Sequence, residues 1–133
     1  MISKYKGKRE SGGWVYGSLV VEPNHDGDIY YIVEFGEKIV EGGKITLIRV
    51  IPETVGQYTG IDDKNGKEIY KGDVVRRINH YGVSDKIYQI IYNNGSFWAQ
   101  KCGGEERCFE IAQTWIKIGN IYDNPELLEA NNG

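Results

Sequence analysis

The sequence has few of the residues that cross-link small proteins or direct them out of the cell. Its 133 residues include only two cysteines, so we expect no disulfide framework. Proline and methionine are also scarce, with three residues and one residue. No apolar run approaches the roughly 18 residues that cross a bilayer. The start also lacks the apolar core and small-residue cleavage site of a secretory signal. We therefore expect no membrane association and a cytoplasmic location.

A strong excess of one charge is also missing. Sixteen Lys and Arg side chains stand against nineteen Asp and Glu side chains, a formal net charge of -3, so no general attraction to phosphate backbones is expected. One basic cluster lies near the start and consists of Lys4, Lys6, Lys8 and Arg9. It could form a local nucleic-acid patch or solvate an edge strand. We favour the solvated edge strand, because charge runs usually lie on solvated faces.

Aromatic and β-branched residues are abundant and occur in short runs. Gly, Asn and Asp separate these runs at intervals of about 8 to 12 residues, which is typical of an all-β meander. A mainly β fold with antiparallel strands is therefore predicted. The expected strands are residues 14–21, 29–35, 39–40, 44–51, 58–61, 67–70, 74–79, 85–92, 96–101, 108–111 and 115–122.

Alternation within residues 29–35 predicts which side of that strand is buried. One face would carry only apolar side chains and the other a mixed set. The wholly apolar face consists of Ile29, Tyr31, Val33 and Phe35. We expect this face to look into the core.

Two short helical segments are expected. Pro52 suits a first helical position and Gly56 suits a stop, so this segment predicts one helical turn. Near the end of the chain, Asn124 is a candidate cap for a short helix that begins at Pro125. Such a short helix is stable only when it is packed.

The chain is expected to form two β subdomains. Residues 1–55 would form an antiparallel amino-terminal sheet, and residues 56–133 a small SH3-like barrel with the terminal helix. Closing short strands into a barrel removes exposed sheet edges. No linker or repeat is visible, so we expect the halves to pack together as one compact unit.

Three separated blocks of the sequence form a recognisable pattern. The longest, residues 55–75, reads VGQYTGIDDKNGKEIYKGDVV; residues 5–9 and 14–17 precede it, and residues 118–128 follow it. Together they resemble the YopX family of small proteins encoded by bacteriophages and prophages. Their order and length far exceed a chance motif. The resemblance implies a phage or prophage origin, a β-rich fold and no established catalytic residues to transfer.

The turn inside the longest block is the first candidate site. Segments rich in turn-forming residues mostly have a structural role. Asp73, for example, could accept hydrogen bonds from the backbone amides that open the next strand. The alternative is a surface recognition loop. Its candidate residues are Asp62, Asp63, Lys64 and Asn65.

Aromatic and basic residues of the second half are the other candidate site. They are Tyr81, Tyr92, Phe97 and Trp98 beside Arg76, Arg77, Lys86 and Lys101. Small barrels can stack bases on such rings. We favour the alternative, in which the rings fill half-buried strand positions that Arg and Lys stems cover. Because Arg76 and Arg77 are adjacent in a strand, one must point to each face.

Metal binding and catalysis have little support. The candidate zinc ligands are His25, His80, Cys102 and Cys108. Five residues separate the cysteines, more than the usual two to four, and we expect a thiol pair rather than a bridge. Asp26 and Asp28 resemble part of a calcium loop without its glutamate, so a plain turn is expected.

A catalytic nucleophile with its base is equally unsupported. Only His80 with Ser84 or Cys108 offers the residue types, and nothing places them together. We therefore expect no enzyme activity and no cofactor. The sequence predicts a protein-binding or adaptor module whose partner is a host or phage protein or a second copy of itself. The alternative is a nucleic-acid-binding small β-barrel.

Overall fold

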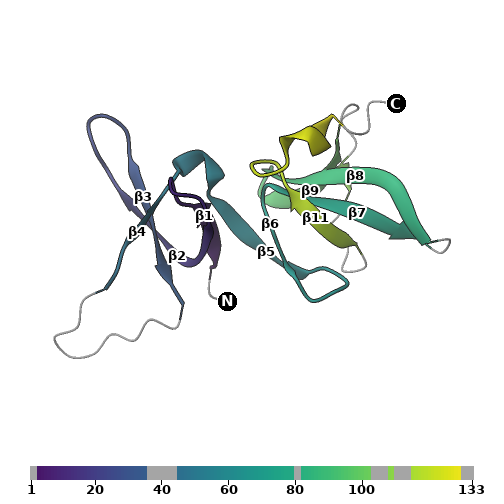
Figure 1. The fold of residues 1–133 in the computed structure, drawn as a ribbon, viewed down its shortest axis with the longest axis horizontal. Coiled ribbons are helices and arrows are strands. Elements are labelled where there is room, and N and C mark those ends of the chain that lie inside the picture. Colours follow the sequence, from purple (N-terminus) through teal and green to yellow (C-terminus); the bar gives the residue numbers. More distant parts are fainter. Residues whose placement is uncertain (1–2, 36–44, 80–81, 103–107, 110–114, 130–133) are drawn as a thin grey trace. The chain divides into compact units, whose positions relative to one another are not determined.

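The computed structural model describes residues 3–35, 45–79, 82–102, 108–109 and 115–129. These residues form two antiparallel sheets, and their only helices are single turns of 3-10 helix (Figure 1). The chain divides into two compact units, Met1–Gln57 and Tyr58–Gly133. The predicted mainly β fold is confirmed, whereas the packing of the two halves as one unit stays a prediction.

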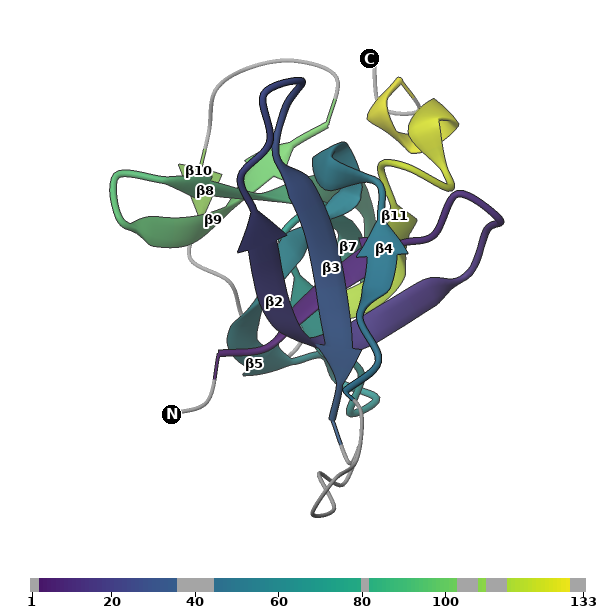
Figure 2. The ribbon, with the colours of Figure 1, turned by 90° about the vertical axis from the view of Figure 1, so that its left-hand side faces the viewer.

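The first unit is an antiparallel sheet. Its elements are β1 (Tyr5–Lys8), β2 (Trp14–Glu22), β3 (Ile29–Glu34), β4 (Ile48–Val50), the 3-10 turn η1 (Pro52–Thr54) and the start of β5 (Gly56–Asp62). The sheet also includes β6 (Glu68–Tyr70) of the second unit, in the strand order β4-β3-β2-β1-β5-β6, and β2, β3 and β4 lie side by side in Figure 2. The turn expected at Pro52 is therefore confirmed, and the strand expected at residues 39–40 lies outside the described residues.

The second unit contains the rest of β5 and all later elements. These are β6 (Glu68–Tyr70), β7 (Asp73–Asn79), β8 (Gly82–Asn93), β9 (Ser96–Lys101), β10 (Cys108–Phe109), β11 (Ile116–Asn120) and the 3-10 turn η2 (Pro125–Leu128). Strands β7 to β11 form one sheet in the order β10-β9-β8-β7-β11, and β5 pairs with β6 in the other. The SH3-like barrel stays a prediction.

The basic segment near the amino end is not a solvated edge strand, contrary to the prediction. It forms β1, which lies inside the sheet between β2 and β5, and Lys6 is 1% exposed. The prediction was wrong because the partner β5 is distant in sequence: Tyr5 pairs with Gln57. Nothing in a local pattern of lysines and glycine reveals such a neighbour.

The buried face of β3 is also the opposite of the predicted one. Ile32 is 0% exposed and packs in a core cluster with Val15 and Val50. Phe35, from the wholly apolar face, remains 44% exposed. The buried face of a strand cannot be assigned from the number of its apolar side chains alone, because single exposed apolar side chains are normal on protein surfaces. Here the register decides, since it aligns Ile32 with Leu19 and Ile48.

The large sheet of the second unit is covered on both faces, as expected for β8. One cluster contains Ile69, Val75, Tyr88, Ile90, Ala99 and Trp115. The rings of Tyr88 and Trp115 stack within it at 5.3 Å between centroids. The other contains Val74, Ile87 and Cys102, with Ile118, Ile121, Leu127 and Leu128 packed against them. Adjacent residues of one strand, such as Val74 and Val75, thus pack into two different hydrophobic clusters.

The expected carboxy-terminal helix is reduced to the 3-10 turn η2. Asn124 does not cap it through its side chain. Its Oδ1 instead accepts the Asn120 N–H at 3.2 Å. The Asn120 side chain in turn accepts the N–H groups of Tyr122 and Asp123. These local bonds form a turn that competes with helix formation, as Asn side chains often do.

Candidate functional site

The turn considered as a recognition loop is held together by a buried carboxylate. Asp63 is 5% exposed. Its Oδ1 accepts the N–H groups of Asn65 at 2.8 Å and Lys67 at 2.9 Å, and its Oδ2 accepts the Lys117 N–H of β11 at 2.9 Å. Asp63 therefore closes the turn and ties it to β11. The suggestion that Asp63 is a surface recognition residue is wrong, because its side chain is buried.

The other residues of this turn differ from Asp63 in exposure. Asp62, Lys64 and Asn65 are exposed. Asp62 accepts a hydrogen bond from the Tyr58 hydroxyl, and this bond raises the pKa of Tyr58 to about 12. The Lys64 N–H donates to the Trp115 carbonyl at 2.9 Å. The backbone of the turn is thus fixed to neighbouring strands, and the exposed side chains stay candidates for recognition.

The hydrogen bonds to Asp63 predict a loss of stability in acid. Burial opposes its ionisation, but the N–H groups of Lys117, Lys67 and Asn65 outweigh this and lower the pKa below its ordinary 3.8. A carboxyl with a lowered pKa contributes stability that is present above the ordinary value and is lost as the pH falls through the folded value. We expect Asp63→Asn to be less stable at pH 7 and to lose less stability on acidification than the native protein.

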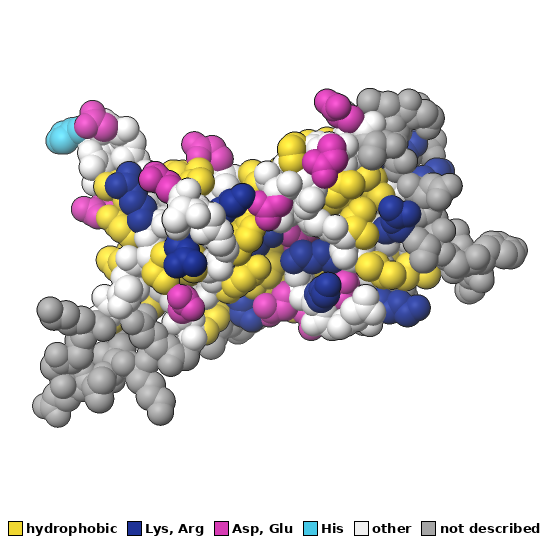
Figure 3. Space-filling model, viewed as in Figure 1, with side chains coloured by type: hydrophobic (Ala, Val, Ile, Leu, Met, Phe, Trp, Pro, Cys, Tyr) yellow, Lys and Arg dark blue, Asp and Glu magenta, His cyan; other side chains and the backbone are white. Residues whose placement is uncertain are grey.

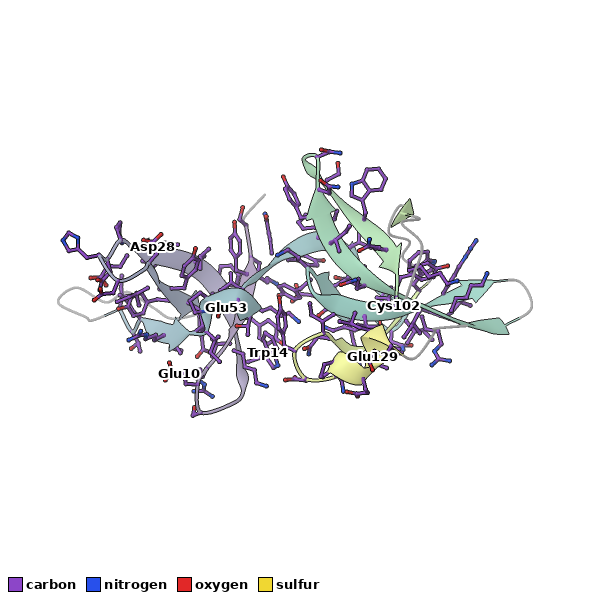
Figure 4. All side chains as sticks on the ribbon, turned by 90° about the horizontal axis from the view of Figure 1, so that it is seen from above. Glu10, Trp14, Asp28, Glu53, Cys102 and Glu129 are labelled. Atoms are coloured by element: carbon purple, nitrogen blue, oxygen red, sulfur yellow. The ribbon has the colours of Figure 1, made fainter. Side chains whose placement is uncertain are left out.

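Urea unfolding followed by circular dichroism between about pH 7 and pH 2 measures this. Asp28→Asn is the matched control, because Asp28 is exposed in the β2–β3 turn (Figure 4). Equal acid destabilisation of the native protein and Asp63→Asn would contradict the role of Asp63.

A second buried carboxylate holds the end of the same block. Asp73 is 0% exposed. Its Oδ2 accepts the Tyr70 N–H at 2.7 Å and lies 3.0 Å from the Lys117 ammonium. That ammonium also donates to the Glu68 carbonyl at 3.2 Å. Asp73 is thus bonded to the preceding strand β6, and the two buried carboxylates both hold β11 through Lys117. The expected bond from Asp73 to the amides that open the next strand stays a prediction.

The aromatic residues of the second candidate site do not share one surface. Phe97 pairs with Tyr92, whereas Trp98 pairs with Ile91, so Phe97 and Trp98 point to opposite faces of the sheet. Phe97 packs against the core, and its ring meets the exposed Tyr92 edge-on at 5.0 Å. The Trp98 indole N–H donates to the Asn93 carbonyl at 3.0 Å. The rings are thus largely occupied with local packing.

The basic residues of that site are separated in the same way. Arg76 is half-buried and aligns with Ile87 and Ile116, whereas Arg77 is exposed. Lys and Arg side chains of the second unit lie among Asp and Glu side chains in Figure 3. Tyr81 lies outside the described residues.

No metal centre is found in the part of the chain that the structure describes: no group of three or more His, Cys, Asp or Glu there could hold an ion. His25 lies in the β2–β3 turn, while His80 and the side chain of Cys108 lie outside the described residues. A turn is present at the aspartates considered for calcium, where Asn24 accepts the N–H groups of Asp26 and Gly27.

Cys102 is a free thiol buried in the second unit (Figure 4). It packs with Val74 and Ile87. Burial raises the pKa of the Cys102 thiol to about 11. Because the thiolate is the reactive form, Cys102 is inert near neutral pH.

The first unit carries a surface, here named the lysine–aromatic face, of which the sequence interpretation identified the lysines but not the aromatic residues. It lies on the side of the sheet opposite the core and comprises Lys4, Lys6, Lys8, Trp14, Tyr16 and Phe35. The register sets Lys6 against Tyr16 and Lys8 against Trp14. The Lys6 ammonium lies 4.4 Å from the centroid of the Trp14 ring, and the Lys4 ammonium lies 5.7 Å from that of Phe35.

This face could have been found from the spacing of its residues. Lysines alternate at Lys4, Lys6 and Lys8, and aromatic residues alternate at Trp14 and Tyr16 across a glycine-containing turn. Alternation of this kind places each set on one face of a hairpin. Tyr16 is 42% and Phe35 44% exposed, so this surface offers both positive charge and aromatic area.

No helix in the described ranges combines the length and apolar character needed to cross a membrane.

Comparisons with known proteins agree with this architecture. The crystal structure of protein EF1440 from Enterococcus faecalis is similar in fold, with a TM-score of 0.52 and 21% sequence identity over 97% of this chain and 99% of that chain. No curated protein sequence matches. The family model described as YopX protein matches residues 12–129. Since this match covers most of the sequence, the chain belongs to the YopX family.

Proposed function

We propose that the protein is a phage- or prophage-borne binding module without enzyme activity, which acts in the cytoplasm of a bacterial host by recognising another protein. The observation that carries this proposal is the distribution of exposed apolar side chains. All the large hydrophobic residues that are exposed in the described ranges, apart from Tyr92, belong to the first unit. They are Tyr16, Val20, Val21, Phe35, Ile45 and Leu47.

Two of these residues lie beside a sheet edge. Among the described residues, β4 pairs with β3 alone, and Ile45 and Leu47 directly precede it with 49% and 46% exposure. Edge strands can be extended by a strand of another protein, in which backbone hydrogen bonds give affinity and alternate side chains give specificity. A host or phage protein, or a second copy of this chain, would bind in this way.

The lack of enzyme activity is supported by how the buried carboxylates are used. Asp63 and Asp73 are committed to backbone N–H groups and to Lys117. A general base needs reach to a substrate proton, which such buried structural carboxylates do not have. The longest sequence block, residues 55–75, here called the signature block, is therefore better explained by a structural role than by catalysis.

Capture of the tagged protein's partner from extract of its host tests the proposal. We expect one specific protein, or a second copy, to be retained by the native chain and lost by the double variant Ile45→Lys, Leu47→Lys. Tyr92→Lys, at an exposed residue of the second unit, is the matched control and should retain it. A repeated absence of any specific partner, together with monomeric sedimentation, would refute the proposal.

Nucleic-acid binding by an SH3-like barrel in the second unit is the alternative. It predicts binding that weakens steeply with salt and is lost in the double variant Arg76→Ala, Arg77→Ala. Binding that survives this variant would exclude the second unit as its source.

A further inference from the structure

We propose that Asn94 is a modification site, at which the folded protein deamidates spontaneously, and that the fold protects the matching residue Asn65 from the same reaction. The proposal concerns the second unit alone and goes beyond the proposed protein recognition. Asn65 and Asn94 are each followed by glycine, as is Asn132, which lies outside the described residues.

The reaction needs only the asparagine, the glycine after it and water. The backbone nitrogen of the glycine attacks the side-chain carbonyl carbon Cγ of the asparagine. A C–N bond forms, the proton of the attacking N–H passes through water to the side-chain nitrogen, and that nitrogen leaves as ammonia. Water then opens the resulting succinimide ring at either carbonyl, which gives aspartate or isoaspartate. Glycine favours the attack, because it has no Cβ atom to block the approach.

Sequence and exposure do not separate the two asparagines. Both are exposed, and so are the glycines that follow them. Gly66 and Gly95 adopt nearly the same backbone conformation, with φ of 80° and 79°, and both have open space beside their Cα atoms. On these grounds alone, Asn65 and Asn94 should react equally fast.

Hydrogen bonds protect Asn65. The Gly66 N–H, which is the attacking group there, donates to the Asp63 carbonyl at 3.0 Å. The buried Asp63 carboxylate also accepts the N–H groups of Asn65 at 2.8 Å and Lys67 at 2.9 Å. Attack on Asn65 therefore requires this turn to open first, and its opening costs free energy.

The turn at Asn94 has no such protection. The pair Asn93 and Ser96 closes the hairpin, so Asn94 and Gly95 lie outside the strand ladder. Among the described residues, neither the Gly95 N–H nor the Asn94 side chain has a hydrogen-bond partner. The Gly95 nitrogen can thus lose its proton without breaking a bond within the protein, which leaves Asn94 as the reactive site.

The two products would change the hairpin differently. Aspartate adds one negative charge and leaves the backbone intact. Isoaspartate lengthens the backbone by one methylene group, which a turn of two residues between Asn93 and Ser96 cannot accommodate. We expect the isoaspartate form to lose the bond from the Trp98 indole N–H to the Asn93 carbonyl. Its indole proton resonance should shift, whereas that of Trp115, stacked on Tyr88 in the core, should not.

Peptide mapping by mass spectrometry, after incubation of the folded protein at mildly alkaline pH, tests the proposal. We expect Asn94 to react roughly 10-fold or more faster than Asn65, since the bonds of the Asp63 turn must open first. In urea, where these bonds are absent, the two should react at similar rates. Asn94→Gly, which keeps a residue that accepts a positive φ, should abolish the modification in this hairpin.

Four outcomes would overturn the proposal. They are equal or faster reaction at Asn65 in the folded protein, no reaction at Asn94 under conditions that modify it in urea, a difference between the two sites that persists in urea, and a modification of the hairpin that survives Asn94→Gly. Circular dichroism checks that the incubated protein and the variant are folded, and Asn132 is counted separately by its own peptide.

Discussion

Replacing Gly17 by alanine is expected to prevent the first unit from folding. A Cβ atom at this position would collide with the Val33 carbonyl oxygen, and would lie 2.7 Å from its carbon and 2.9 Å from the Glu34 Cα. These are backbone atoms of the paired strand β3, so no side-chain rotation can relieve the contact. Only separation of β2 from β3 would make room, and the core behind them would open.

We expect a loss of about 4 kcal/mol or more, which places this substitution among the exceptionally damaging ones. Urea unfolding followed by circular dichroism measures it. Ser18→Ala, at the next residue of β2, is the control and should change stability by about 0.5 kcal/mol or less. A Gly17→Ala protein with native spectrum and unfolding midpoint would show that β2 and β3 do not pair in this register.

Replacing Asp73 by alanine is expected to destabilise the second unit almost as strongly. The substitution removes the partner of the Lys117 ammonium and the acceptor of the Tyr70 N–H in one step. Breaking a buried ion pair from one side costs about 3 to 5 kcal/mol, because a charge is left without compensation. Asp73→Asn, which retains an acceptor oxygen, should lose less.

A double-mutant cycle separates the ion pair from the backbone hydrogen bond. If the uncompensated ammonium dominates, adding Lys117→Met to Asp73→Ala should recover part of the lost stability. Urea unfolding of the four proteins gives the coupling free energy. Lys64→Met, at an exposed lysine of the β5–β6 turn, is the control. Strictly additive losses would mean that Asp73 and Lys117 do not interact.

The features predicted correctly from the sequence are those determined by local chemistry. The predicted strands 85–92 and 96–101 leave a short turn between them, in which Asn94 and Gly95 adopt φ of 51° and 79°, the left-handed conformation that a tight hairpin requires. Pro52 similarly begins η1, because its ring fixes φ for a first helical position. Neighbouring residues suffice to specify such turns, so their positions could be predicted directly from the sequence.

The features that were missed depend on contacts between distant residues. The pairing of β1 with β5 joins Lys6 to Gly56, and Asp63 meets Lys117 across 54 residues. The buried face of β3 likewise depends on which side its neighbours cover, and a period-two pattern with apolar residues on both faces leaves that choice open. The position of Phe35 in the lysine–aromatic face depends on such a contact as well, since Phe35 lies beside Tyr16 only because Gly17 pairs with Glu34.

Amide hydrogen exchange tests most directly whether the signature block has a structural role, in which the Asp63 carboxylate fixes the turn to β11. The N–H groups of Asn65, Lys67 and Lys117, bonded to the Asp63 carboxylate, are predicted to exchange as slowly as those in the middle of β7 and β8. Exchange at the rate of an open surface loop would contradict this and would favour the alternative, a surface recognition loop.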